Sequence, residues 1–259
     1  MIAVAAEAGL TAAPPGYTRF AAREATVVAR NDAADGVRAA LREVRTLHCW
    51  ASTLPGAKAF QGRATAWGAR LPQTAIDVVV RHARHGGILA AITGDRFLTP
   101  GRAPWELDVS ERLREAGVPT PAVIAYALYP AGPGFCRCDV ATRRLPDGGD
   151  LPDLWRDADA ATRAAILVAT GALLRALAAV RAVHPDLNAK NVYLARDGNS
   201  WRAYVLDVDR IVFRRAGDDR AGARNCARLV RSLRKFRSKH GLQVSEEEVA
   251  TMERLASAP

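Results

Sequence analysis

The sequence contains few cysteines, and their spacing argues against a zinc site or a redox disulfide. The four cysteines are Cys49, Cys136, Cys138 and Cys226. Only Cys136 and Cys138 are close, and their C-x-C spacing differs from the C-x-x-C pairs of zinc sites and redox motifs. The five histidines add no set with transition-metal spacing. We therefore expect a protein of a reducing compartment without a transition-metal centre.

Long hydrophobic runs are also missing. The longest run lies within residues 164–174, between Arg163 and Arg175, and it is shorter than the ~20 residues that span a bilayer. Residues 1–16 are rich in alanine and end in Pro-Pro-Gly, which is typical of a flexible tail. This segment contains Glu7 and no basic residue, so it does not fit a secretory signal. These features predict a cytoplasmic protein.

Lysine is scarce, although the chain is strongly basic. Only four of the 37 Lys and Arg residues are lysine, and the formal net charge is +10. The balance has two interpretations: a coding bias with added solubility, or an anionic partner such as nucleic acid, a phosphorylated lipid or a nucleotide. The basic segment at 218–239 has Phe236 as its only aromatic residue, whereas single-strand binding uses interleaved aromatics. We therefore expect no nucleic-acid partner.

The remaining composition is that of a globular protein, with 49% hydrophobic and 25% charged residues. Runs of β-branched residues predict strands at 24–30, 76–82, 123–129, 135–144, 192–195 and 203–206, with a hairpin over 58–70. Apolar periodicity predicts helices at 35–50, 103–116, 159–183, 218–239 and 246–255, and a loop is expected at 146–149. This order predicts an α+β fold with an N-lobe at 17–132 and a C-lobe at 133–259.

The segment from His184 to Asn191 carries the most informative pattern, H-x-D-x-x-x-x-N. It places Asp186 and Asn191 on one short loop, and Asp207 follows at the end of an apolar strand. A carboxylate and an amide oxygen can hold Mg²⁺ or Mn²⁺ beside a phosphoryl group, while another carboxylate accepts the proton of an acceptor hydroxyl. The spacing therefore predicts phosphoryl transfer, with Asp186 as the base and with Asn191 and Asp207 as metal ligands. His184 is expected to be structural.

Residues upstream of this segment follow the order of protein-kinase motifs. Gly62 and Arg63 lie in the predicted hairpin, where a kinase has its phosphate-covering loop. Arg81 closes the strand at 76–82, and Glu106 in the next helix is its expected partner. Pro185 replaces the arginine of the kinase H-R-D motif, so we expect no control by phosphorylation of an activation loop.

Several of these segments together resemble the Kdo kinase (3-deoxy-D-manno-octulosonic acid kinase) branch of the lipopolysaccharide core kinases, in the protein-kinase-like superfamily. They are RHARHGG, WELDVSERLREAGVPTP, HPDLNAKNVYL, VLDVDR and NCARLVRSLRKF, and the resemblance runs from about residue 61 to 239. It implies a bilobal protein-kinase-like fold with a β-rich N-lobe and a short, mainly helical C-lobe. It also implies phosphorylation of a sugar hydroxyl on the Kdo of Kdo-lipid A, with ATP and Mg²⁺ or Mn²⁺, on the cytoplasmic face of the inner membrane.

The resemblance implies roles for individual residues as well. Asp186 would be the catalytic base, Asn191 and Asp207 would be metal ligands, and Gly62, Arg63, Arg81 and Glu106 would form the nucleotide-binding set. The family usually opens its phosphate loop with G-R-G, and here Ala64 replaces the second glycine.

Alternatives to this interpretation stay open at the level of sequence. The chain could be a kinase-like phosphotransferase acting on a protein Ser/Thr or a small molecule, or a non-catalytic pseudokinase binding an anionic partner. The predicted helix at 218–239 also has two interpretations. Its basic stripe is either a solvated helix face or a contact with anionic lipid. The lipid would be Kdo-lipid A, another anionic glycolipid or the membrane surface. The stripe consists of Arg224, Arg228, Arg231 and Arg234.

Overall fold

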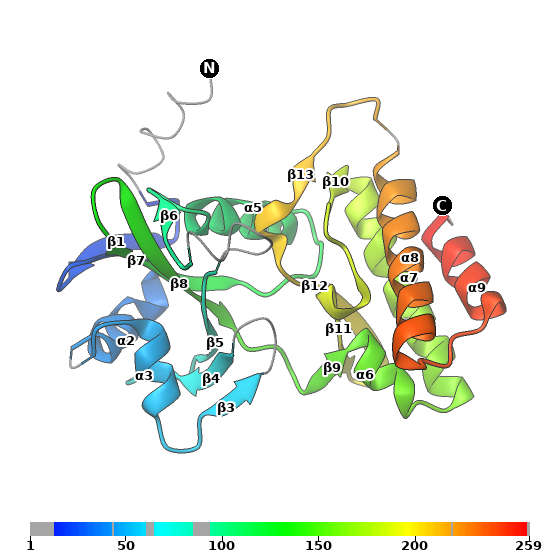
Figure 1. The fold of residues 1–259 in the computed structure, drawn as a ribbon, viewed down its shortest axis with the longest axis horizontal. Coiled ribbons are helices and arrows are strands. Elements are labelled where there is room, and N and C mark those ends of the chain that lie inside the picture. Colours follow the sequence, from blue (N-terminus) through cyan, green and yellow to red (C-terminus); the bar gives the residue numbers. More distant parts are fainter. Residues whose placement is uncertain (1–12, 43, 61–64, 85–93, 219, 258–259) are drawn as a thin grey trace. The chain divides into compact units, whose positions relative to one another are not determined.

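The computed structural model describes residues 13–42, 44–60, 65–84, 94–218 and 220–257 (Figure 1). Gly62, Arg63 and most of the expected tail at 1–16 lie outside the described residues. The chain divides into two compact units. Unit 1 contains residues 1–108 and 122–144, and unit 2 contains residues 109–121 and 145–259.

Unit 1 is built on one antiparallel sheet with the strand order β1-β2-β7-β8-β5-β4-β3, and β6 pairs with β8. The strands are β1 (Tyr17–Ala22), β2 (Ala25–Arg30), β3 (Lys58–Phe60), β4 (Ala66–Arg70), β5 (Asp77–His82), β6 (Phe97–Leu98), β7 (Val123–Pro130) and β8 (Phe135–Arg143). The pairing of β3 with β4 confirms the predicted hairpin, and the pairing of β7 with β8 confirms the predicted strand pair.

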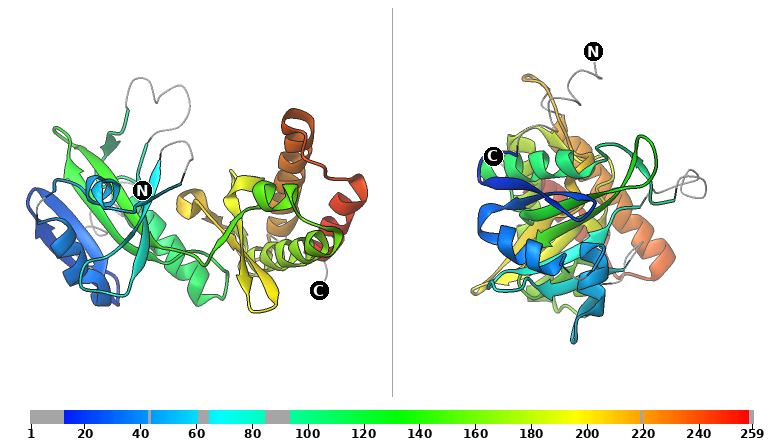
Figure 2. Two further views of the ribbon diagram at one scale, coloured as in Figure 1. Left: turned by 90° about the horizontal axis from the view of Figure 1, so that it is seen from below. Right: turned by 90° about the vertical axis from the view of Figure 1, so that its left-hand side faces the viewer.

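Helices cover both faces of this sheet, because side chains alternate between the faces along each strand. On one face, Val78 and Val80 pack with α2 (Ala34–Ala40) and α3 (Leu47–Thr53). On the other face, Leu128 and Val140 pack with Leu107 of α5 (Ala103–Glu115). Figure 2 shows α2 and α3 on the opposite side of the sheet from α5. Each face of the sheet therefore has its own hydrophobic core.

The single helix predicted at 35–50 is wrong, because the chain breaks it into α2 and α3. Helix α2 ends at Ala40, and Leu41 is its C-cap. Helix α3 begins after Thr46, whose hydroxyl accepts a hydrogen bond from the Cys49 amide at 3.0 Å. A threonine in extended conformation is a favoured N-cap, so it starts a new helix here instead of continuing the old one.

Helix α7 (Ala160–Ala179) is the central helix of unit 2. Asp159 caps it by accepting a hydrogen bond from the Thr162 amide at 2.7 Å. It packs against α8 (Ala221–His240), α9 (Glu246–Ser257) and β12 (Ser200–Val205). By length and composition alone this helix could cross a membrane, but a helix buried in a protein core can have the same features. Ile166 and Leu177 of this helix are completely buried in the core of unit 2.

Short strands complete unit 2. They are β9 (Gly148–Asp150), β10 (Ala182–Val183), β11 (Val192–Asp197), β12 and β13 (Val212–Phe213), and α6 (Leu151–Arg156) follows β9. The loop predicted at 146–149 is wrong in its second half, because β9 pairs with β11. A Cβ atom on Gly148 would lie 1.9 Å from the carbonyl oxygen of Leu194. The missing side chain thus permits a close backbone approach, which is a known use of glycine in strands.

The division between the units differs from the expected lobe boundary at 132/133. Strand β8 pairs with both β5 and β7, so the sheet extends to Arg143 and unit 1 extends to residue 144. Residues 109–121 belong to unit 2, where Leu113 and Val118 join its core. The α+β class is confirmed, with a β-rich unit 1 and a mainly helical unit 2.

Candidate functional site

The loop at residues 184–191 of unit 2 is organised around the buried side chain of His184. His184 is fully buried. Its Nε2 donates to the Leu206 carbonyl at 3.1 Å, and its Nδ1 accepts from the Asp186 amide at 3.2 Å. A carbonyl only accepts and an amide only donates, so this arrangement selects the neutral tautomer protonated at Nε2. Burial lowers the pKa of His184 below 6.5, which favours the same neutral form. His184 therefore has the expected structural role.

Asp186 and Asn191 lie together on this loop. One carboxylate oxygen of Asp186, Oδ2, pairs with Nη1 of Arg210 at 2.5 Å, and both side chains are partly exposed. The amide nitrogen of Asn191 donates to the main-chain oxygen of Asp186 at 3.1 Å. Because Nδ2 of the planar amide points toward Asp186, the amide oxygen Oδ1 of Asn191 points away from Asp186. The carboxylate of the predicted base is thus oriented by an arginine and stays accessible to solvent.

Asp207 lies where β12 ends and the short 3-10 helix η3 (Val208–Arg210) begins. Its backbone has φ 54° and ψ 49°, the left-handed conformation. A non-glycine residue there costs of the order of 1–3 kcal/mol, and such strain is concentrated at functional sites. The Leu206 amide donates to the Asn191 carbonyl at 2.9 Å, so the backbones carrying Asn191 and Asp207 are directly connected.

Asn191 and Asp207 form a donor set that suits a hard divalent cation. Mg²⁺ is commonly bound by one or two protein oxygens together with substrate phosphates. A carboxylate and an amide oxygen on two hydrogen-bonded segments match this pattern. No group of three or more His, Cys, Asp or Glu side chains suited to a metal ion occurs in the part of the chain that the structure describes. The residues therefore fit a cation shared with a phosphorylated ligand.

Helix α8 anchors the backbone of the loop through one of its faces. Asn225 is completely buried. Its Oδ1 accepts from the His184 amide at 3.0 Å, and its Nδ2 donates to the Ala182 carbonyl at 2.8 Å. Ser232 accepts from the Ala189 amide at 3.0 Å, and Arg228 donates to the main-chain oxygen of Pro185. We call Asn225, Arg228 and Ser232 the α8 anchor residues. They hold the loop from both sides of Asp186.

The candidate nucleotide-binding residues lie in unit 1. Arg81 is the penultimate residue of β5, and its Nη2 forms an ion pair with Oε1 of Glu106 in the first turn of α5. Glu106 is 4% exposed, whereas the side chain of Arg81 is 30% exposed. The structure therefore brings this predicted pair together, with the carboxylate buried behind a guanidinium that reaches solvent. Gly62 and Arg63 lie outside the described residues, and the strands β3 and β4 on either side of them are paired.

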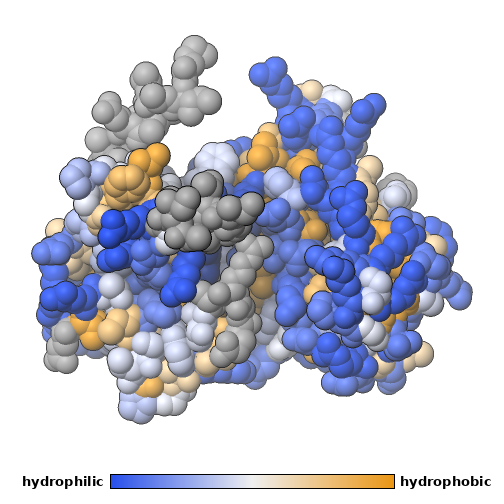
Figure 3. Space-filling model, viewed as in Figure 1, coloured by the Kyte–Doolittle hydropathy of each residue, from blue (hydrophilic) through white to orange (hydrophobic). Residues whose placement is uncertain are grey.

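The predicted basic stripe of α8 is not a uniform charged surface. Arg224 pairs with Asp218 at 3.0 Å, and Arg234 pairs with Glu246 at 2.9 Å. Arg228 is one of the α8 anchor residues, whereas Arg231 and the neighbouring Lys235 are exposed. Figure 3 shows a largely hydrophilic surface over α8 and α9. Much of the charge in the stripe is thus used inside unit 2.

Sequence reasoning missed several residues of this site. Arg210 stands three positions after Asp207 in VLDVDR, and its distance from Asp186 along the chain gives no local signal of their pairing. Asn225 is a polar residue among the apolar positions of a predicted helix, and this exception to the pattern is the sequence signal for a buried polar role. His82 is the last residue of β5, and its 15% exposed side chain lies between Asp95 and Asp139, a placement that no short-range pattern in the sequence indicates.

Comparison with known proteins places this chain among lipopolysaccharide kinases. The model of the lipopolysaccharide kinase (Kdo/WaaP) family matches residues 48–255. The 3-deoxy-D-manno-octulosonic acid kinase of Stenotrophomonas maltophilia is 31% identical over 197 residues, which cover 74% of this chain and 75% of that protein. The enzyme of the same name from Actinobacillus succinogenes is 28% identical over 191 residues, covering 72% and 78%. A solved structure of WaaP in complex with acyl carrier protein aligns with a TM-score of 0.49, 18% identity and 82% coverage of both chains.

Proposed function

Because this chain belongs to the lipopolysaccharide kinase (Kdo/WaaP) family, we propose that it transfers the γ-phosphoryl group of ATP to a hydroxyl of the Kdo residue in the lipopolysaccharide inner core. The relatives named above, which are Kdo kinases, support this acceptor. The observation that carries the proposal is the loop on which Asp186, oriented by Arg210, lies beside Asn191.

The proposed reaction uses the free carboxylate oxygen of Asp186. The sugar hydroxyl oxygen forms a bond to the γ-phosphorus, and the bond from that phosphorus to the β,γ-bridging oxygen breaks. The hydroxyl proton passes to Oδ1 of Asp186, since Oδ2 is bound to Arg210. ADP keeps the electron pair of the broken bond. Asp186 is thus proposed as the catalytic residue, and Arg210 as the residue that holds its carboxylate in place.

The remaining candidate residues would bind and orient the donor. Arg81, held by Glu106, would bind phosphate oxygens of the nucleotide, in the role that lysine has in protein kinases. Gly62 and Arg63 would contribute from the loop between β3 and β4. Asn191 and Asp207 would hold Mg²⁺ or Mn²⁺, which when bound neutralises charge on the transferred group.

A peripheral contact with the cytoplasmic face of the inner membrane forms part of this proposal, because the acceptor is carried by a lipid. The net charge of +10 supports contact with an anionic surface. Exposed Arg231 and Lys235 on α8 are the residues we propose for it.

The test is transfer of labelled phosphate from ATP to Kdo-lipid A, with lipid A lacking Kdo as the acceptor control. We expect label on the Kdo glycolipid with wild-type protein. Asp186→Asn should reduce kcat by about 10²–10⁴-fold, the usual range for a general base. Asp197→Asn is the matched control, because Asp197 pairs with Arg202 on the β11–β12 hairpin and should leave the rate unchanged. Equal labelling of lipid A without Kdo would contradict the acceptor, and an active Asp186→Asn variant would contradict the base.

A further inference from the structure

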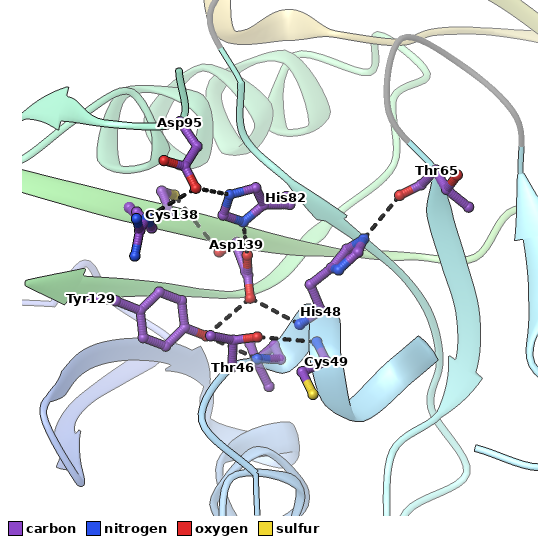
Figure 4. Close-up of polar contacts among 11 residues, drawn as sticks. Thr46, His48, Cys49, Thr65, His82, Asp95, Tyr129, Cys138 and Asp139 are labelled. Atoms are coloured by element: carbon purple, nitrogen blue, oxygen red, sulfur yellow. Dashed lines mark hydrogen bonds and ion pairs between the residues drawn. The ribbon is translucent and has the colours of Figure 1, made fainter. Parts of the chain in front are cut away.

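His82 lies next to Arg81 in β5, but its side chain points to the opposite face of the sheet, because side chains alternate along a strand. It is directly opposite Asp139 in the pairing of β5 with β8. Its Nδ1 lies 2.6 Å from Oδ1 of Asp139, and its Nε2 lies 3.1 Å from Oδ2 of Asp95 (Figure 4). Because carboxylates accept hydrogen bonds, both ring nitrogens of an imidazolium can donate here. The end of β5 that carries Arg81 is therefore fixed through its neighbour.

Asp139 is the buried centre of this network. It is completely buried, and its Oδ2 accepts from the His48 amide at 2.8 Å and from the Tyr129 hydroxyl at 3.1 Å. The same hydroxyl accepts from the Leu47 amide at 2.9 Å. A buried carboxylate is costly unless a cation and hydrogen-bond donors compensate it. His82 supplies the cation, so Asp139 binds the first turn of α3 to the strand of Arg81.

His48 extends the network toward the β3–β4 hairpin. Its Nε2 lies 2.9 Å from the main-chain oxygen of Thr65, the residue before β4. Its ring centroid is 5.9 Å from that of His82. Figure 4 shows His48 pointing from α3 toward Thr65, with Asp139 between His82 and the start of α3. In sequence, Thr65 comes just after the proposed phosphate-loop residues Gly62 and Arg63. One network thus connects the Arg81 strand with the strand that follows this loop.

We propose that His82, Asp139 and His48 are positioning residues of the nucleotide-phosphate site, which they hold in its binding arrangement through Arg81 and Thr65. The inference rests on the proposed function, in which Arg81 binds phosphate oxygens of the donor. The three residues act through Arg81 and Thr65 and touch no substrate. Their loss should therefore raise the KM for ATP and leave the KM for the acceptor unchanged.

The network also predicts a direction for the effect of pH. The hydrogen bond that His82 donates to Asp139 raises the pKa of His82 above 6.5, burial opposes this shift, and Asp95 adds to it. The groups facing His82 are Asp139 and Arg137 from β8, Asp95 before β6, His48 from α3 and Tyr129 from β7. Arg137 pairs with Asp95 at 2.9 Å, so its positive charge reduces the effect of the Asp95 carboxylate on the pKa of His82. Since the folded pKa is raised, the anchoring is complete below 6.5 and is lost as pH rises through the folded pKa.

The experiment measures the affinity of the full chain for ATP with Mg²⁺ by titration calorimetry, from neutral to alkaline pH. We expect wild type to bind ATP more weakly at alkaline pH than at neutral pH. His82→Gln should weaken binding by about tenfold at neutral pH, as loss of a supporting partner commonly does, and its affinity should change less with pH. His48→Ala removes the contact with Thr65 and keeps the backbone bond to Asp139, so it tests the network even where His82→Gln does not fold. His240→Gln, on the exposed end of α8, is the matched histidine control and should bind as wild type does.

The outcomes separate this inference from the proposed acceptor. Unchanged ATP affinity in both folded variants would overturn the positioning role, as would a fall in kcat with the KM for ATP unchanged. A wild-type protein that binds no ATP would overturn it too, because there would be no donor site to position. If wild type binds ATP and leaves Kdo-lipid A unlabelled, the acceptor proposal fails, and the affinities of the two variants still decide the role of the network.

Discussion

At the scale of single residues, the half-buried His82 and the buried His184 have pKa values shifted in opposite directions because their partners differ. His82 lies between the carboxylates of Asp95 and Asp139, and its pKa is raised by the hydrogen bond that it donates to Asp139. His184 lies between a carbonyl and an amide, and burial lowers its pKa. The same residue type is therefore a charged connector in unit 1 and a neutral connector in unit 2.

His184 predicts a loss of stability at acidic pH. Its folded pKa is lowered, so the unfolded state binds more protons; the stability present above 6.5 is lost as pH falls through the folded pKa. His184→Gln keeps a side-chain donor and cannot titrate. Its free energy of unfolding should therefore change less below pH 6.5, by ~1.4 kcal/mol for each unit of the pKa shift. Urea unfolding of both proteins across this range checks the prediction. Parallel pH profiles for wild type and variant would contradict it.

At the scale of elements, α8 stabilises the loop that carries Asp186. Its anchor residues Asn225, Arg228 and Ser232 follow helical steps of three and four, so they lie on one face of the helix. The sequence shows this helix clearly as a basic amphipathic segment. It does not show that one face contacts the loop at 184–191, because the partners are 41 to 43 positions away.

Replacement of Asn225 should damage both stability and catalysis. Asn225→Ala leaves the His184 amide and the Ala182 carbonyl without their buried partner, at about 1–3 kcal/mol for each group. The rate should also fall, since the loop of Asp186 loses an attachment. Urea unfolding and phosphate transfer measure the two effects. Ser238→Ala on the exposed end of the same helix is the control, and equal stability of the two variants would refute the anchoring.

Two adjacent glycines in β9 should differ sharply in their tolerance of alanine. A Cβ on Gly148 would lie 1.9 Å from the Leu194 carbonyl oxygen, a backbone atom that cannot move without breaking the β9–β11 pairing. A Cβ on Gly149 would lie 3.2 Å from Cγ of Leu154, a side chain that can adjust. We expect Gly148→Ala to lower the free energy of unfolding by about 1–3 kcal/mol or more, as overpacking of a core does, and so to lower the melting temperature strongly. Gly149→Ala should lower the melting temperature little. Similar melting temperatures would show that β9 does not pair as described.

At the scale of the whole molecule, the basic residues behind the net charge of +10 differ in how accessible they are to a partner. Arg224 and Arg234 of α8 pair with acidic residues, and Arg228 is bound to a main-chain oxygen. Exposed Arg231 lies between Arg228 and Arg234, and exposed Lys235 follows Arg234. Fewer cations of α8 are therefore available to a partner than its count of Arg and Lys residues indicates.

Binding to anionic vesicles should reflect this difference. With vesicles of phosphatidylglycerol, Arg231→Gln with Lys235→Gln should weaken binding by about 1 kcal/mol for each charge near the surface. Arg224→Gln with Arg234→Gln is the matched control of equal charge change, and it should weaken binding less because both residues have carboxylate partners. Co-sedimentation at low and high salt measures the effect, which salt should screen. Equal losses for the two pairs would mean that net charge alone governs binding.

The sequence alone was sufficient to predict the α+β class, most of the strands and the placement of Asp186 and Asn191 on one loop. These features depend on short-range patterns: alternation in strands, helical periodicity, and the spacing of Asp186 and Asn191 on one loop. The pairing of Arg81 with Glu106 was also within reach, because the order of kinase motifs indicated it. Local chemistry determines these features, since each one needs only residues that are close in the chain or ordered along it.

Only the tertiary structure decided which distant groups support those residues. It broke the helix predicted at 35–50 at Thr46, added β9 where a loop was predicted, and extended the sheet of unit 1 to Arg143. It also brought Asp139 to His48, 91 positions away, and Asn225 to His184, 41 positions away. A buried polar group must find its partner wherever the packing of the core places one. That requirement has no period in the sequence, so these contacts become visible only once the chain is folded.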